Sequence, residues 1–104
     1  MNIVGVTACT VGIAHTYMAR EKLMEAGKRL GIEVRLEAQG SAGIEFPLTE
    51  EEIKAADLVL FCVDIGVNGK ERFKGKPIVE VPTKLGIKSP ENLLTKIREK
   101  WEAH

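Results

Sequence analysis

Apolar and polar positions along the chain fall into short apolar runs separated by longer mixed segments. Residues 2–8 and 58–63 are almost continuously apolar, which is typical of central strands covered on both faces. Residues 33–37 alternate polar and apolar side chains, as a half-buried strand does. With residues 78–81 as a further apolar run, the pattern predicts four strands.

The longest mixed segment predicts a helix from His15 to Leu30. Its residues are mostly good helix formers, and Gly31 supplies the left-handed stop. We expect residues 39–47 to form a glycine-containing loop. Residues 64–75 should also be mostly loop, with one turn of helix around residues 71–73.

Two further helices are predicted from their start signals. Thr49, followed three residues later by Glu52, forms a capping box for the second helix. Ser89 as N-cap and Pro90 at the first helical position open the last one. That last helix should pack through an apolar stripe that includes the single tryptophan: Leu93, Leu94, Ile97 and Trp101.

The alternation of strands and helices predicts the α/β class. We expect one domain over residues 1–104, built on an open, mainly parallel four-stranded sheet of order 2-1-3-4. Helices should cover both faces, as in a Rossmann- or flavodoxin-like three-layer sandwich. Ligands of such sheets bind beyond the carboxyl ends of the strands, where the winding reverses. Here that place holds residues 9–16 beside Asp64.

Composition and charge give no sign of a nucleic-acid or membrane partner. The 104 residues carry 15 Lys plus Arg and 15 Asp plus Glu, so no basic excess favours nucleic acid or an acidic membrane. No apolar stretch approaches the ~20 residues of a membrane span, and no signal-peptide pattern opens the chain. We expect a cytoplasmic protein that is a monomer and docks transiently.

The two cysteines have different expected roles. Cys62 lies inside an apolar strand and is interpreted as core packing. Cys9 lies where a strand ends shortly before a helix, so backbone N–H groups and the helix dipole favour both thiolate and bound phosphate. The cysteines form no C-x-x-C pair or zinc-ligand cluster, so we expect two free thiols. The predicted phosphate-binding loop consists of Thr10, Val11, Gly12, Ile13, Ala14 and Thr16.

The spacing of Cys9 and His15 can be compared with the C-x5-R-[ST] loop of protein tyrosine phosphatases. His15 stands where those enzymes have arginine, and it offers fewer donors and only partial charge at pH 7. Hydrolysis of a phosphocysteine should then be slow, which suits a phosphoryl carrier. His15 is thus a candidate phosphate stabiliser, although His15 or Thr16 as a simple helix cap remains open.

Three residues are candidates for the rim of the site: Gln39, Gly40 and Asp64. A carboxylate at position 64 works against a thiolate at Cys9 unless it is turned away. Segments 39–43 and 9–16 should meet at one sheet edge, although an ordinary connection explains residues 39–43 equally well. The charged runs 70–72 and 96–100 are expected to be solvated surface.

Two blocks of this sequence resemble the IIB component of fructose-type permeases of the bacterial sugar phosphotransferase system. The family pattern V-T-A-C-P-T-G-I-A-H-T is matched by Val-Thr-Ala-Cys-Thr-Val-Gly-Ile-Ala-His-Thr at residues 6–16. The pattern V-E-T-Q-G-x-x-G-I-E-N is matched by Leu-Glu-Ala-Gln-Gly-Ser-Ala-Gly-Ile-Glu-Phe at residues 36–46. The departures include Thr10 and Val11 in place of Pro-Thr.

The resemblance implies a phosphoryl relay during sugar uptake, with no metal and no organic cofactor. A phosphohistidine on a IIA protein would donate to Cys9, and the phosphocysteine would pass its group to fructose or a similar sugar bound by a membrane IIC protein. The chain would then be a free-standing IIB subunit. Three alternatives stay open: a small cysteine phosphatase, a flavodoxin-type flavin-binding domain, and a regulatory binding module that has lost transfer.

Overall fold

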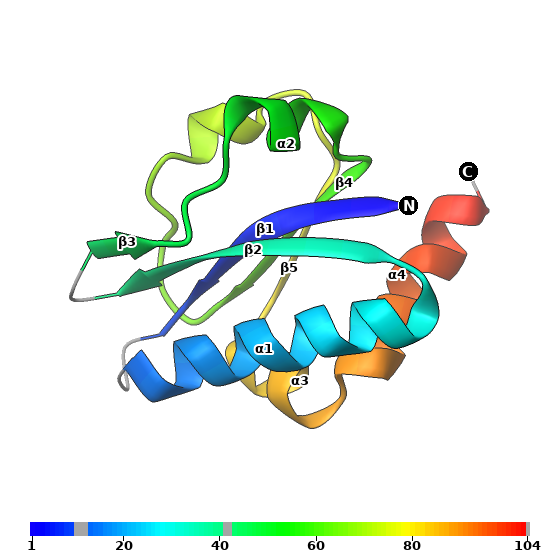
Figure 1. Cartoon of the computed structure of the whole chain (residues 1–104), viewed down its shortest axis with the longest axis horizontal. Helices are drawn as coiled ribbons and strands as arrows, with labels where there is room; N and C mark the ends of the chain where they lie inside the picture. The colour runs from blue at the N-terminus through cyan, green and yellow to red at the C-terminus, as the bar shows by residue number, and fades with distance from the viewer. Residues whose placement is uncertain (10–12, 41–42, 104) are drawn as a thin grey trace.

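The computed structural model describes residues 1–9, 13–40 and 43–103, which form a single twisted sheet with helices on both faces (Figure 1). The elements in chain order are β1 (Asn2–Ala8), α1 (Ile13–Leu30), β2 (Glu33–Gly40), β3 (Gly43–Glu45), α2 (Glu50–Ala55), β4 (Leu58–Val63), η1 (Lys70–Phe73, a 3₁₀ turn), β5 (Ile78–Val81), α3 (Thr83–Lys88) and α4 (Pro90–Glu102).

The sheet has the order β3-β2-β1-β4-β5. Strands β2, β1, β4 and β5 are parallel, so the predicted 2-1-3-4 order and the α/β class are confirmed for these four. The prediction of four strands is wrong, because β3 adds an antiparallel edge strand through pairs such as Gln39 with Ile44. The interpretation of residues 39–47 as a loop is wrong for the same reason.

The two faces of the sheet carry separate cores. Helices α1, α3 and α4 cover one face, and α2 with η1 covers the other (Figure 1). Alternate residues of β1 supply each core: Ile3 faces the α1 side, whereas Val4 and Val6 face the α2 side. Because both faces of the central strands β1 and β4 are buried, their sequences are continuously apolar.

Several predicted boundaries are confirmed. Gly31 ends α1 with φ +72°, a left-handed conformation that glycine adopts without a steric penalty. The capping box of α2 forms, with Thr49 accepting from the Glu52 N–H and Glu52 accepting from the Thr49 N–H. The predicted turn of helix near residue 72 is η1.

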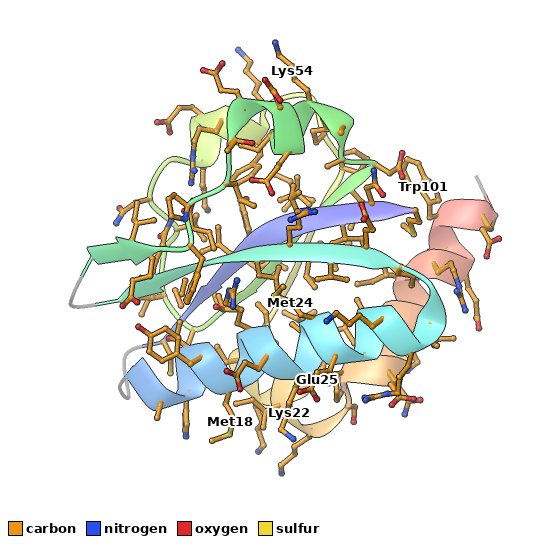
Figure 2. All side chains as sticks on the ribbon, viewed as in Figure 1. Met18, Lys22, Met24, Glu25, Lys54 and Trp101 are labelled. Carbon is orange, nitrogen blue, oxygen red and sulfur yellow. The ribbon has the colours of Figure 1, made fainter. Side chains whose placement is uncertain are left out.

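The last third of the chain differs from the prediction in three ways. A six-residue helix, α3, follows β5 directly and was not predicted. Pro90 begins α4, but Ser89 makes no side-chain cap. Trp101 is 37% exposed at the far end of α4 rather than in the core (Figure 2).

Candidate functional site

Cys9 and Asp64 follow directly on two neighbouring parallel strands, β1 and β4. Ala8 pairs with Val63, and the Asp64 N–H donates to the Ala8 carbonyl over 2.9 Å. The residues after these two strands are therefore held side by side at the carboxyl edge of the sheet. The start of α1 and the β2–β3 hairpin lie at the same end of the molecule (Figure 1).

The two side chains contact each other. The Cys9 Sγ donates to Asp64 Oδ2 over 3.1 Å, and Cys9 is 6% exposed while Asp64 is exposed. The predicted meeting of residue 9 with Asp64 is confirmed. The carboxylate is therefore not turned away from the sulfur: Asp64 Oδ2 is the hydrogen-bond acceptor of the Cys9 thiol.

Thr83, the first residue of α3, holds the other side of this carboxylate. Its N–H donates to Asp64 Oδ1 over 3.1 Å, and its hydroxyl donates to Asp64 Oδ2 over 2.6 Å. The carboxylate thereby caps the first turn of α3, which has no cap from Pro82. Thr83 is 3% exposed, so its hydroxyl has a fixed direction.

These contacts favour the charged form of Asp64. The Thr83 hydroxyl, followed by the Cys9 thiol, the Thr83 N–H and the positive charge of His15, outweigh desolvation and hold the pKa of Asp64 below its usual range. Asp64 is therefore a carboxylate at neutral pH. The influence of His15 also places that side chain within electrostatic reach of the Cys9–Asp64 pair.

The remaining predicted loop residues lie around the start of α1. Thr10, Val11 and Gly12 lie outside the described residues, and Ile13 is the first residue of α1. His15 and Ala14 are exposed, whereas Thr16 is 1% exposed with no hydrogen-bond partner for its hydroxyl within residues 1–9, 13–40 and 43–103.

Gln39 is buried and holds the loop that follows Asp64. Its amide donates to the Asn68 carbonyl and accepts from the Asn68 N–H, both over 2.9 Å. A third hydrogen bond runs to Glu37 Oε2. Gln39 therefore ties β2 to the loop that follows Asp64, and Gly40 ends β2 beside it, partly exposed.

Glu37, which is fully buried, and Arg72, whose side chain is 30% exposed, form an ion pair next to Gln39. Arg72 donates to both carboxylate oxygens of Glu37, over 3.0 and 2.9 Å. Burial alone would raise the pKa of Glu37, but hydrogen bonds from Arg72, Gln39 and the Leu48 N–H hold it below the usual range. The prediction that residues 70–72 are solvated surface is wrong for Arg72.

Cys62 lies in the core, as predicted. It is fully buried, and burial raises the pKa of its thiol to about 11. The described residues contain no group of three His, Cys, Asp or Glu side chains that could hold a metal ion. Within that same part of the chain, no helix combines the length and apolarity required to cross a bilayer.

Comparison with known proteins shows to which family this chain belongs. The family model described as "PTS system, Lactose/Cellobiose specific IIB subunit" matches residues 4–96. The chain is 47% identical over 102 residues to the PTS system fructose-like EIIB component 2 of Escherichia coli K12, covering 98% of this chain and 92% of that protein. This chain belongs to the fructose-type IIB components of the phosphotransferase system.

Two other relatives extend the comparison of this IIB component. It is 46% identical over 94 residues to the fructose-specific EIIABC component of Bacillus subtilis, covering 90% of this chain and 15% of that longer protein. A crystal structure of a domain from the fructose-specific IIABC component of Borrelia burgdorferi has 46% identity and a TM-score of 0.84, covering 91% of this chain and 90% of that one. The resemblance in the sequence and the flavodoxin-like α/β fold are thereby confirmed.

Proposed function

We propose that this IIB component carries a phosphoryl group on Cys9 between a IIA phosphohistidine and a sugar bound by a membrane IIC protein. The observation that carries this proposal is the position of the Cys9 thiol at the carboxyl edge of the sheet, shortly before α1. The relative from B. subtilis is named as an EIIABC component, which supports IIA and IIC domains as the two partners. The transfers take place at the cytoplasmic side of the membrane.

The chemistry is nucleophilic catalysis with a covalent intermediate. The sulfur of Cys9 attacks phosphorus, and the N–H groups in the first turn of α1, from Ile13 onward, stabilise the transferred oxygens at the positive end of this helix. His15 adds positive charge beside them. A carrier needs little more than positioning and charge stabilisation, since donor and acceptor are brought by the partners.

The sugar is set chiefly by the IIC partner, and we propose fructose or a similar sugar on the basis of the relatives' names. The competing function is a small cysteine phosphatase. A protein that releases its phosphoryl group to water would turn over p-nitrophenyl phosphate rapidly. We expect this chain not to do so, because His15 stands in place of a bidentate arginine.

The test is mass spectrometry after incubation with phosphoenolpyruvate, the general phosphotransferase proteins and a fructose-type IIA protein. We expect a single added phosphoryl group on the wild type and none on Cys9→Ser. Cys62→Ser is the matched control, because it makes the same exchange within the core, and it should be labelled normally.

His15→Ala should be labelled more slowly with its circular dichroism spectrum unchanged. An unchanged rate would reduce His15 to an exposed helix residue. Labelling that survives in Cys9→Ser but disappears in Cys62→Ser would mean that the wrong thiol has been assigned.

A further inference from the structure

The relay leaves the thiol proton without an assigned destination. In the unphosphorylated protein the Cys9 thiol donates its hydrogen to Asp64 Oδ2 over 3.1 Å. An S–P bond cannot form until this proton leaves. The first atom on its path is a carboxylate oxygen, which can take a proton as well as a hydrogen bond.

We infer that Asp64 accepts the Cys9 proton as the phosphoryl group arrives, keeps it while the phosphocysteine exists, and returns it to the sulfur when the group departs. This inference rests on the relay proposed above. It gives Asp64 a catalytic role, through its contact with the reacting sulfur, and it gives Thr83 a positioning role.

The step balances as follows. The S–H proton moves to Asp64 Oδ2 and the S–P bond forms as the P–N bond of the donor histidine breaks. The electron pair of that bond stays on the donor ring, which leaves as neutral imidazole when its other nitrogen carries a proton. In the second transfer the S–P bond breaks, sulfur keeps the electron pair, and Asp64 returns the proton. The proton of the sugar hydroxyl goes to a base of the IIC protein.

The change in charge at Cys9 explains why a carboxylate with a lowered pKa can accept the thiol proton. Before transfer, Asp64 contacts the Cys9 thiol and lies within electrostatic reach of Cys62 and His15, and its own hydrogen bonds keep it ionised. A phosphocysteine places up to two negative charges beside it. Like charges at this distance strongly disfavour a second ionised group, so the arriving phosphoryl group itself raises the proton affinity of Asp64.

Thr83 fixes the direction of the carboxylate. Its two hydrogen bonds hold both oxygens of Asp64, and they leave Oδ2 aimed at the sulfur. When Asp64 is protonated, the Thr83 hydroxyl still accepts or donates at the same place. The arrangement of Cys9, Asp64 and Thr83 therefore stays the same whether Asp64 is charged or neutral. A group that accepts and returns a proton in every cycle needs such a constant geometry.

The test compares two reactions of Cys9 in Asp64→Asn, an exchange that keeps shape and hydrogen bonding to Thr83 but removes the base. The first is the single-turnover rate of phosphorylation by the phosphorylated IIA protein from pH 6 to 8. The second is the alkylation rate of Cys9 by iodoacetamide, followed by peptide mass spectrometry, which reports the thiolate alone.

We expect the two rates to change in opposite directions. Phosphorylation of Asp64→Asn should be about a hundredfold slower at pH 7 and rise about tenfold per pH unit, because the proton must leave to solvent. Alkylation should be severalfold faster, because a negative charge next to the sulfur has been removed. Asp57→Asn makes the same exchange at the opposite end of β4 and should match the wild type in both assays.

Three other outcomes would overturn the inference. If both reactions are faster in Asp64→Asn, the carboxylate only repels the thiolate. If both are slower by the same factor, Asp64 has only a structural role, through its contacts with Cys9 and Thr83. If phosphorylation is unchanged, the proton has another destination while the relay itself stands. A wild type that takes no phosphoryl group would instead remove the relay, and the proton step with it.

Substitutions at Thr83 provide a second test in case the Asp64→Asn variant fails to fold. Thr83→Ala should slow phosphorylation and Thr83→Ser should restore it, because only serine keeps the hydroxyl that donates to Asp64 Oδ2. Equal rates in the two Thr83 variants would contradict the positioning role.

Discussion

Cys62 lies in β4 and Cys9 directly follows the neighbouring strand β1, and the hydrogen-bond partners of the two thiols make them different. The Cys62 Sγ donates over 3.5 Å to the carbonyl of Pro82, inside the core. The Cys9 Sγ donates to a carboxylate that reaches solvent. A carbonyl can only share the proton, whereas a carboxylate can take it. Both partners depend on the β5–α3 junction, because Pro82 accepts from Cys62 and Thr83 holds the carboxylate that accepts from Cys9.

The largest difference should appear in alkylation of the native protein. Burial raises the pKa of the Cys62 thiol to about 11, so at pH 7 only about one molecule in ten thousand carries the reactive thiolate there. Cys62 must also wait for the core to open, so we expect it to react more than about a thousandfold slower than Cys9. Peptide mass spectrometry after iodoacetamide treatment measures both rates, and comparable rates in the native state would break the comparison.

The next largest effect should come from Arg72→Ala. It tests whether the surroundings of Cys9 depend on the Glu37–Arg72 ion pair more than those of Cys62 do. The variant leaves Glu37 buried without its partner and should lose about 3 kcal/mol of unfolding free energy at pH 7. Loop 64–69 should loosen, so alkylation of Cys9 should change more than that of Cys62. The matched control is Arg35→Ala, whose half-exposed pair with Glu52 should contribute less than about 0.5 kcal/mol.

The pH dependence of this loss has a definite sign. In the wild type the pKa of Glu37 lies below its unfolded value, so the pair stabilises the fold above that value and the contribution is lost as the pH falls through the folded pKa. Without Arg72, burial raises the pKa of Glu37 instead. The deficit of the variant should therefore shrink between pH 7 and pH 4 in urea titrations, and a constant deficit would contradict the assignment.

The smallest effect should come from Gly86→Ala, which probes the packing around Cys62. A Cβ at Gly86 would lie 2.6 Å from the Cys62 Sγ and 3.1 Å from Leu23 Cδ1, so α3 must move away from β4. We expect a loss of about 2 kcal/mol in thermal or urea unfolding. Adding Cys62→Ala should recover part of it, because the smaller side chain makes room.

Gly66→Ala serves as the control for this packing test. A Cβ there meets open space, and the change should stay within about 0.5 kcal/mol. A double variant of Gly86 and Cys62 with strictly additive losses would mean that the sulfur is not what resists the added methyl group.

The parallel core and the meeting of Cys9 with Asp64 could be predicted from the sequence, and for one reason. Continuous apolar runs identify central strands, and the residues after neighbouring parallel strands must share an edge. The alternating pattern of residues 33–37 was informative about the strand but misleading about Glu37. That side chain is buried by loop residues such as Leu48, which strand periodicity does not describe.

The parts that could not be predicted depend on contacts distant in sequence. Thr83 has no motif of its own, and α3 is too short to show a helical period. Arg72 looked like one charge in a polar run because its partner lies 35 residues away. The β2–β3 hairpin was hidden by the glycines that allow it to turn.

The shared carboxylate of Asp64 also makes α3 a reporter of the state of the sulfur. Whatever changes the charge of Asp64 alters the field at the Thr83 amide, which donates to the opposite oxygen. The chemical shift of that one amide should therefore follow the loading of the carrier. A protein that docks against α3 would then contact a helix whose first residue, through its two hydrogen bonds to Asp64, responds to whether Cys9 is phosphorylated.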